Sequence, residues 1–265
     1  MQRHVRAELD LELGSSVDLI LQIAVARSAG ALSERLSVMQ DGRELRPREL
    51  MDAAGNRLHR LTGEAGPLQV RYEAVVGAGA EPATTEIDTI TALRPSRYAQ
   101  SDEVFATARR LFRGLSGRAL VEAVSEFVAT SVTYTPGMSL GTDSAVTTLA
   151  SGQGVCRDYA HLVIALLRAM DVPARYVACY APRLDPMDFH AVAEVLVEGE
   201  WSVVDATRLA PRTSLVRIGT GRDAADCAFL SYHGGYVGLE RLEVDATVKD
   251  APETVDDHVS LVSMS

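Results

Sequence analysis

Cysteine and aromatic residues are scarce in this chain of 265 residues. It has 3 cysteines, 5 phenylalanines and a single tryptophan. The cysteines are odd in number and form no Cys-x-x-Cys pair, so the sequence indicates neither a disulfide framework nor a zinc site. A calcium loop of the EF-hand kind is also missing. We therefore expect no metal and no cofactor, and we read Cys179 and Cys227 as structural residues.

Positive charge and long apolar runs are also in short supply. The chain has 26 lysines and arginines against 36 acidic residues, which gives a net charge of −10. Nucleic-acid-binding proteins carry a basic face, so we expect no nucleic-acid partner. No apolar run approaches the roughly 20 residues that span a bilayer, and the first residues lack the apolar segment of a signal peptide. The sequence therefore predicts a cytoplasmic protein with no membrane contact.

The segment Gly154–Leu162 places a cysteine at the start of a strongly patterned helix. A glycine-containing loop comes first, and from Cys156 onward apolar residues recur at helical spacing until Pro173. Unpaired backbone N–H groups and the positive end of the helix dipole favour a thiolate over a thiol at such a position. Arg157 adds positive charge. Cys156 is thus a candidate nucleophile, with a buried structural cysteine as the alternative.

Two strands joined by a tight turn follow this helix. Residues 188–197 and 200–207 read as the arms of a hairpin with a two-residue turn. A loop of that length sets Val192 opposite Asp205. Because residues two apart in a strand share a face, His190 and Asp205 are expected to lie on one face as diagonal neighbours. A slip of one residue would put them on opposite faces.

A cysteine at a helix start, a histidine on one strand and an aspartate on the next are the parts of a Cys-His-Asp triad. In such a triad the thiolate attacks a carbonyl, the imidazole moves the proton to the leaving amine, and the carboxylate orients the imidazole. Each residue alone has a plainer reading, since a strand histidine is often structural and Asp205 could begin the turn that follows. The combination favours catalysis.

Three segments resemble the catalytic blocks of the bacterial transglutaminase-like superfamily. They are, in chain order, Gly-Val-Cys-Arg-Asp-Tyr-Ala-His-Leu, Asp-Phe-His-Ala-Val-Ala-Glu-Val and Trp-Ser-Val-Val-Asp-Ala-Thr-Arg. The resemblance implies a papain-like core in which Cys156 is the nucleophile, His190 the general base and acid, and Asp205 the orienting residue. Val192 and Ala206 stand where the family often has tryptophan and proline. These two departures affect packing and turn shape rather than the chemistry.

The expected fold class is α+β. Residues 1–95 contain short β-like stretches separated by turns rich in glycine, proline and asparagine, with no helix beyond one short turn at 46–53. They predict a small all-β sandwich, which the resemblance also implies. Residues 96–265 form the predicted transglutaminase-like catalytic domain, where helical patterns precede the cysteine and strands follow it. That order favours helices packed on an antiparallel sheet, with the cysteine helix across it.

Other polar residues lie near these blocks. Tyr134 is a candidate oxyanion donor beside the backbone N–H of Cys156, with a core tyrosine as the alternative. Asp158 and His161 do not share the thiol's face of the helix, so we read both as structural, with His161 bonded to a backbone carbonyl. Four residues of a later glycine-containing segment could border the cleft but receive no role: Arg222, Asp223, His233 and Tyr236.

Two functions remain open at this point. The first is a thiol enzyme that acts on an amide bond of a peptide or protein through an acyl-enzyme. Water as the second substrate gives a cysteine peptidase or amidase and an amine gives a transglutaminase; hydrolysis is preferred because water is always available. The second is a non-catalytic module that binds a peptide or a partner protein and keeps a vestigial triad. The sequence predicts neither the substrate's identity nor the oligomeric state.

Overall fold

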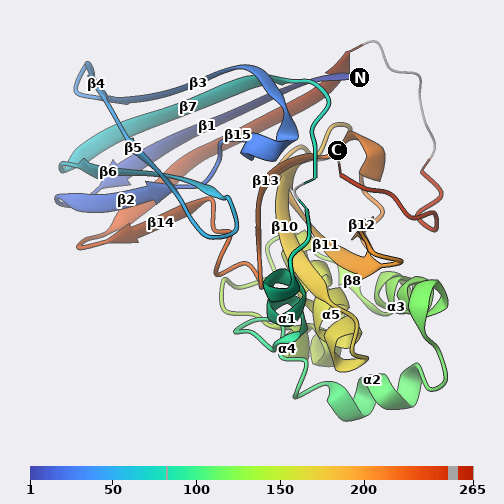
Figure 1. Ribbon diagram of the computed structural model, residues 1–265. Helices are drawn as coiled ribbons and strands as arrows, with labels where there is room; N and C mark the ends of the chain where they lie inside the picture. Colours follow the sequence, from blue (N-terminus) through green and yellow to red (C-terminus); the bar gives the residue numbers. More distant parts are fainter. Residues whose placement is uncertain (82, 250–255, 265) are drawn as a thin grey trace.

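A β-sandwich and an α+β unit make up the protein (Figure 1). The computed structural model describes residues 1–81, 83–249 and 256–264. None of the helices in these ranges has the length and apolar character that crossing a membrane requires. The cytoplasmic location stays a prediction.

Two antiparallel sheets form the sandwich. One has the strand order β15-β1-β7-β3-β4 and the other β14-β2-β6-β5. The strands of the first are β1 (Gln2–Leu13), β3 (Ala31–Gln40), β4 (Arg43–Leu45), β7 (Gly66–Val76) and β15 (Val237–Lys249). Those of the second are β2 (Val17–Leu21), β5 (Arg48–Met51), β6 (Arg57–Gly63) and β14 (Leu230–His233).

The sandwich core follows from alternating side chains. In β1 every second residue from Val5 to Leu13 is buried, and β7 repeats the pattern from Leu68 to Val76. These residues pack against β2, whose Leu19 and Leu21 are fully buried. A period of two with one apolar face is what two packed sheets require. The all-β character expected for this part is therefore present in the structure.

The sandwich takes strands from beyond the predicted boundary at residue 95. β15 pairs along the whole of β1, and β14 pairs with β2. Both strands come after β13 (Val216–Gly221), a strand of the α+β unit, so the chain leaves the sandwich, builds the sheet of the second unit and returns. The two units also share apolar contacts, because Tyr180 lies in the sandwich core and its hydroxyl donates to the carbonyl of Ile23 at 2.8 Å. The domain boundary itself stays a prediction.

Two local expectations in the first part were wrong. Residues 46–53 form no helical turn, because β5 runs through them and pairs with β6. Helix α1 (Glu86–Leu93) was not expected, and its N-terminus is capped by mutual hydrogen bonds between Thr85 and Asp88. Its apolar residues Ile87 and Ile90 are exposed, so the helix lacks the buried face that periodicity detects.

The second unit is a four-stranded antiparallel sheet covered by helices, as expected. The sheet order is β12-β11-β10-β13. Its strands are β10 (Ala174–Tyr180), β11 (Phe189–Val197), β12 (Glu200–Val204) and β13 (Val216–Gly221). Four helices precede them: α2 (Phe105–Leu111), α3 (Gly117–Ser131), α4 (Ala145–Ser151) and α5 (Cys156–Ala169). A short parallel pair, β8 (Thr133–Tyr134) and β9 (Gln153–Gly154), lies just before α5.

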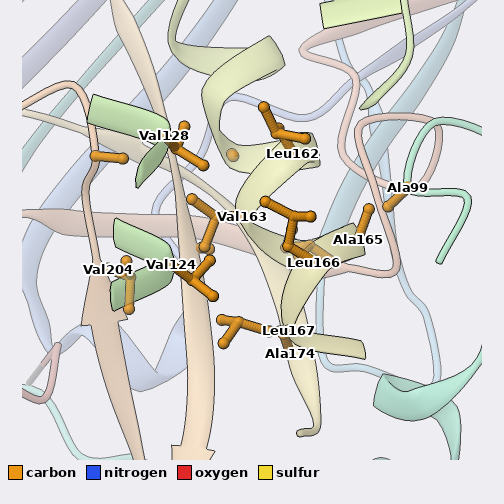
Figure 2. Packing of buried hydrophobic residues seen from close by; sticks show 14 of the residues in the cluster. Ala99, Val124, Val128, Leu162, Val163, Ala165, Leu166, Leu167, Ala174 and Val204 are labelled. Carbon is orange, nitrogen blue, oxygen red and sulfur yellow. The ribbon is translucent and has the colours of Figure 1, made fainter. Parts of the chain in front are cut away.

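Helix α5 is the centre of this unit. Every residue from Asp158 to Ala169 is buried, so the helix is covered on all sides. Figure 2 shows Val163 and Leu166 among Val124 and Val128 of α3, with Val204 of the sheet nearby. A helix held in this way has little freedom to move, and its first residue is fixed relative to the sheet.

Candidate active site

The nucleophile candidate Cys156 is the first residue of α5, where the sequence predicted it. Val155 is the extended residue before the helix, and its N–H donates to Oδ2 of Asp158 at 2.9 Å. This bond satisfies one of the donors that a helix start leaves open. A Cβ at Gly154 would lie 2.6 Å from Cβ of Asp158, so only glycine fits against this cap. Asp158 is therefore structural, as expected.

Arg157 fixes the loop beside the helix start. Its guanidinium donates to Oγ of Ser139 at 2.7 Å and to the carbonyl of Leu140, and Oδ1 of Asp158 lies 3.5 Å away. The positive charge predicted beside the thiol is present, and it also holds residues 139 and 140 near Cys156.

The hairpin has the register that the sequence predicted. Val197 lies opposite Glu200 across the two-residue turn, and Ala193 lies opposite Val204. Continued by one residue, this register brings Asp205 beside the His190 end of β11. Nε2 of His190 and Oδ2 of Asp205 are 2.9 Å apart, and both side chains are buried. His190 and Asp205 therefore form a close pair.

The two ring nitrogens of His190 have different partners. Nε2 faces the Asp205 carboxylate, which only accepts, so the nitrogen that carries the proton in the neutral imidazole is Nε2. Nδ1 is buried and has no hydrogen-bond partner among the described residues. The charge of Cys156 is among the causes that raise the pKa of His190. In the neutral imidazole Nδ1 is therefore the nitrogen that can accept a proton.

The buried pair favours charges of opposite sign. Burial disfavours the imidazolium, but the charge of Asp205 and its hydrogen bond outweigh burial and raise the pKa of His190 above its ordinary value. Burial likewise opposes the Asp205 carboxylate, while His190 and Thr207 stabilise it and lower its pKa overall. An imidazolium beside a carboxylate is the state that this geometry stabilises.

Thr207 is a positioning residue that sequence reasoning missed. Oδ1 of Asp205 accepts hydrogen bonds from the Thr207 N–H at 3.0 Å and from its hydroxyl at 2.6 Å. These bonds hold the carboxylate so that Oδ2 points to His190. The signal was present in the sequence, because an aspartate followed two residues later by threonine favours such a turn.

Tyr134 lies beside the nucleophile, where the sequence proposed an oxyanion donor. The parallel bridge between β8 and β9 sets Tyr134 next to Gly154, two residues before the cysteine. The backbone N–H of Cys156 acts to lower the pKa of Tyr134, but it is outweighed. Burial, with added repulsion from Cys156, raises the pKa of Tyr134 to about 12, so the hydroxyl keeps its proton. The ring packs on Tyr159, with centroids 6.0 Å apart.

His161 is structural, but its partner differs from the expected carbonyl. Its Nε2 accepts the N–H of Ala224 at 3.1 Å, and its ring lies between those of Tyr98 and Tyr176. Burial lowers the pKa of His161 to about 3, so the ring is neutral and can accept. The expectation of a carbonyl was wrong, because Nε2 accepts the N–H of Ala224 in the loop after β13 instead of donating to a carbonyl of the sheet.

The remaining candidates lie away from the His190–Asp205 pair. Asp223 accepts the N–H of Tyr98 at 2.8 Å, and Arg222 pairs with Asp226 at 2.9 Å, so both tie down a loop. His233 is in β14 of the sandwich, and Tyr236 follows in the turn before β15.

The two other cysteines are buried among apolar residues. Cys179 belongs to the cluster on the face of the sheet opposite α5, and Cys227 to the core around α5. Burial raises the pKa of both thiols above the ordinary value. Both environments fit the structural reading of these residues.

We also looked for a metal site and for a cavity near His190 and Asp205. Within the described ranges, no group of three or more histidine, cysteine, aspartate or glutamate side chains could hold a metal ion. A cavity of about 850 Å³ lies between the sandwich and the outer face of the sheet, lined among others by Arg175, Trp201 and Arg217. Cys156, His190 and Asp205 do not line it.

Comparison with known proteins places these features in a family. The profile of the transglutaminase-like superfamily matches residues 106–206, a range that contains Cys156, His190 and Asp205. A crystal structure from Cytophaga hutchinsonii, described as "a putative cysteine protease", is 33% identical with a TM-score of 0.90, and the match covers 98% of this chain and 96% of that one.

A more distant relative is the uncharacterized protein ML0607 of Mycobacterium leprae. It is 28% identical over 166 residues, which are 59% of this chain and 59% of that protein. Together, the matching profile and the close likeness to the Cytophaga structure over nearly its whole length show that the chain belongs to the transglutaminase-like superfamily.

Proposed function

We propose that this protein is a thiol-dependent enzyme that acts on amide bonds of peptides or proteins through an acyl-enzyme on Cys156. The observation that carries the proposal is the His190–Asp205 pair, 2.9 Å apart and buried, together with a cysteine at the start of a helix whose charge acts on His190. The likeness to a structure described as "a putative cysteine protease" also supports it.

Acylation uses both nitrogens of His190. Nδ1 takes the proton of the Cys156 thiol while Asp205 stabilises the imidazolium through Nε2. The sulfur then forms a bond to the carbonyl carbon of the substrate. As the tetrahedral intermediate collapses, the carbon–nitrogen bond breaks and the imidazolium gives its proton to the leaving amine. The product is a thioester on Cys156 and a free amine.

In deacylation, His190 acts as a base toward water and then as an acid toward the Cys156 sulfur. His190 takes a proton from an incoming water, whose oxygen attacks the thioester carbon, and the carbon–sulfur bond breaks. The acid product leaves and the sulfur regains a proton from the imidazolium. An amine in place of water would give a new amide instead. We favour hydrolysis, because water is always available to the thioester.

The carbonyl oxygen becomes negative in both steps and needs donors. We propose that the Cys156 N–H and the Tyr134 hydroxyl supply them, since the bridge between β8 and β9 sets Tyr134 opposite Gly154, two residues before Cys156. Replacing Tyr134 with phenylalanine is expected to lower kcat by about 10²-fold, the scale for removal of one oxyanion donor. Steady-state kinetics would measure this. An unchanged kcat in this variant would assign Tyr134 to the core alone.

The product distinguishes between the possible reactions. We suggest incubating the protein with a peptide library and a primary amine, followed by mass spectrometry. Cleavage yields two smaller peptides, deamidation turns an amide into an acid, and transamidation adds the mass of the amine minus ammonia. We expect cleavage or deamidation. No change in any peptide, together with retention of peptides on the protein, would favour the non-catalytic binding module.

A further inference from the structure

The outer edge of β12 is covered by a segment from far along the chain. β12 is an edge strand of its sheet and leads directly into Asp205. Residues Asp256–Met264, here called the strap, run along this edge. The Val203 N–H donates to the carbonyl of Val262 at 2.7 Å, and the Ser263 hydroxyl donates to the carbonyl of Trp201 at 2.9 Å. An edge strand left bare would expose these groups to water.

Arg212 joins the strap to the same strand. Its guanidinium donates to the carbonyls of Val203 at 3.1 Å and Ser260 at 2.9 Å. It also pairs with Asp256 at 2.8 Å, and the side chains of both residues are less than a tenth exposed. The backbone N–H of Arg212 donates to the same carboxylate at 2.7 Å. The strap is therefore attached at several points to the strand that carries Asp205.

The strap also contributes a residue to an apolar cluster of the sheet. Met264 is buried in a cluster on the face of the sheet opposite α5, with Val192 and Val203 among its members. Val192 lies two residues after His190 and Val203 two residues before Asp205, so the cluster adjoins both members of the pair along the chain. The side chains of His190 and Asp205 are 0% and 1% exposed, which leaves their attraction unscreened by water.

We propose that the strap is a positioning element for the active site: it holds the end of β12 so that Asp205 keeps His190 in register with Cys156. The inference rests on the proposed function. It differs from a purely stabilising role, because it predicts slower chemistry at Cys156 in protein that remains folded.

Two full-length variants loosen the strap in different ways. Asp256→Asn keeps the shape of the side chain but removes the charge that pairs with Arg212. Met264→Ala removes only apolar contact with the cluster. Asp18→Asn is the matched control, since it breaks the Arg60–Asp18 ion pair of 2.7 Å in the sandwich. Should Asp256→Asn fail to fold, Met264→Ala carries the test.

Two readouts separate positioning from stability. The first is the rate at which iodoacetamide alkylates Cys156, measured by peptide mapping where circular dichroism shows folded protein. We expect both strap variants to react on the order of 10- to 100-fold more slowly than wild type, the scale for a small misplacement of reacting groups. The second is the NMR titration of His190, identified as the signal missing in His190→Gln. Its midpoint is expected to fall toward the ordinary value of 6.5.

The outcomes keep the two proposals apart. Strap variants that match Asp18→Asn in alkylation rate and in the His190 titration would overturn the positioning role, while leaving a reactive wild-type Cys156 in place. A wild-type Cys156 that reacts no faster than Cys179 and Cys227 would instead overturn the proposed function.

Discussion

Replacing Cys156 with alanine is expected to abolish amide-bond chemistry and to remove the fast-reacting thiol from the protein. Loss of the nucleophile lowers kcat by about 10⁶-fold in an enzyme with a catalytic triad, so the remaining activity should not be detectable. Labelling by iodoacetamide at neutral pH should fall to the slow background of the two buried cysteines. Peptide mapping and an activity assay on the same samples would measure both effects.

The fold should survive this substitution. Cys156 is half-buried at the first position of α5, and the cap of that helix comes from Asp158 rather than from the thiol. Circular dichroism and thermal unfolding are therefore expected to match those of wild type. Fast labelling that persists at Cys179 or Cys227 would show that the nucleophile was assigned to the wrong thiol.

Asp205→Asn is expected to have the second largest effect. An asparagine can occupy the same space but cannot stabilise the imidazolium, and its amide N–H₂ can favour the other tautomer of His190. The expected loss in kcat is on the order of 10³- to 10⁴-fold, as for the orienting aspartate of other triads. Kinetics on matched protein samples would measure it. A loss of less than tenfold would show that Asp205 does not orient the base.

The same variant should reverse the direction in which the pKa of His190 departs from its ordinary value. In the wild-type protein the Asp205 charge outweighs burial, so the midpoint lies above the ordinary pKa of 6.5. Without the carboxylate, burial dominates and the midpoint is expected below 6.5. NMR of the imidazole signals would measure the change, with His190→Gln to assign the resonance. A midpoint that does not move would contradict the pairing.

The thermal stability of the protein should depend on pH through the charges of His190 and Asp205. Because the folded-state pKa of His190 is raised from 6.5, its contribution is fully present below pH 6.5 and is lost as pH rises through the raised value. The pKa of Asp205 is lowered from 3.8, so its contribution is present above that pH and lost on further acidification. The difference in Tm between wild type and Asp205→Asn should therefore be widest from about pH 4 to 6.5 and narrow at higher pH.

Local patterns predicted the parts of the site that depend on local structure. The start of α5 at Cys156 followed from a glycine-containing loop and a regular apolar pattern. The closeness of His190 and Asp205 followed from a two-residue turn, since turn length alone fixes register in a hairpin. The family resemblance added the reaction class, which the pattern of residues left open.

Features that depend on distant contacts could not be predicted in this way. The pairing of β15 with β1 joins residues more than two hundred positions apart, and no local periodicity indicates such a partner. The strap is another case, since its contacts with β12 are visible only once the sheet has formed. Helix α1 was missed because its apolar residues face outward and its capping signal is short.

The most direct test of the account is a search for an acyl group on Cys156 during turnover. Wild-type protein would be mixed with a reactive peptide, quenched in acid, digested and analysed by tandem mass spectrometry. We predict a thioester on the peptide that contains Cys156, removable by hydroxylamine and absent from the Cys156→Ala variant. Turnover that proceeds with no adduct on Cys156, and that continues in Cys156→Ala, would contradict the proposed chemistry.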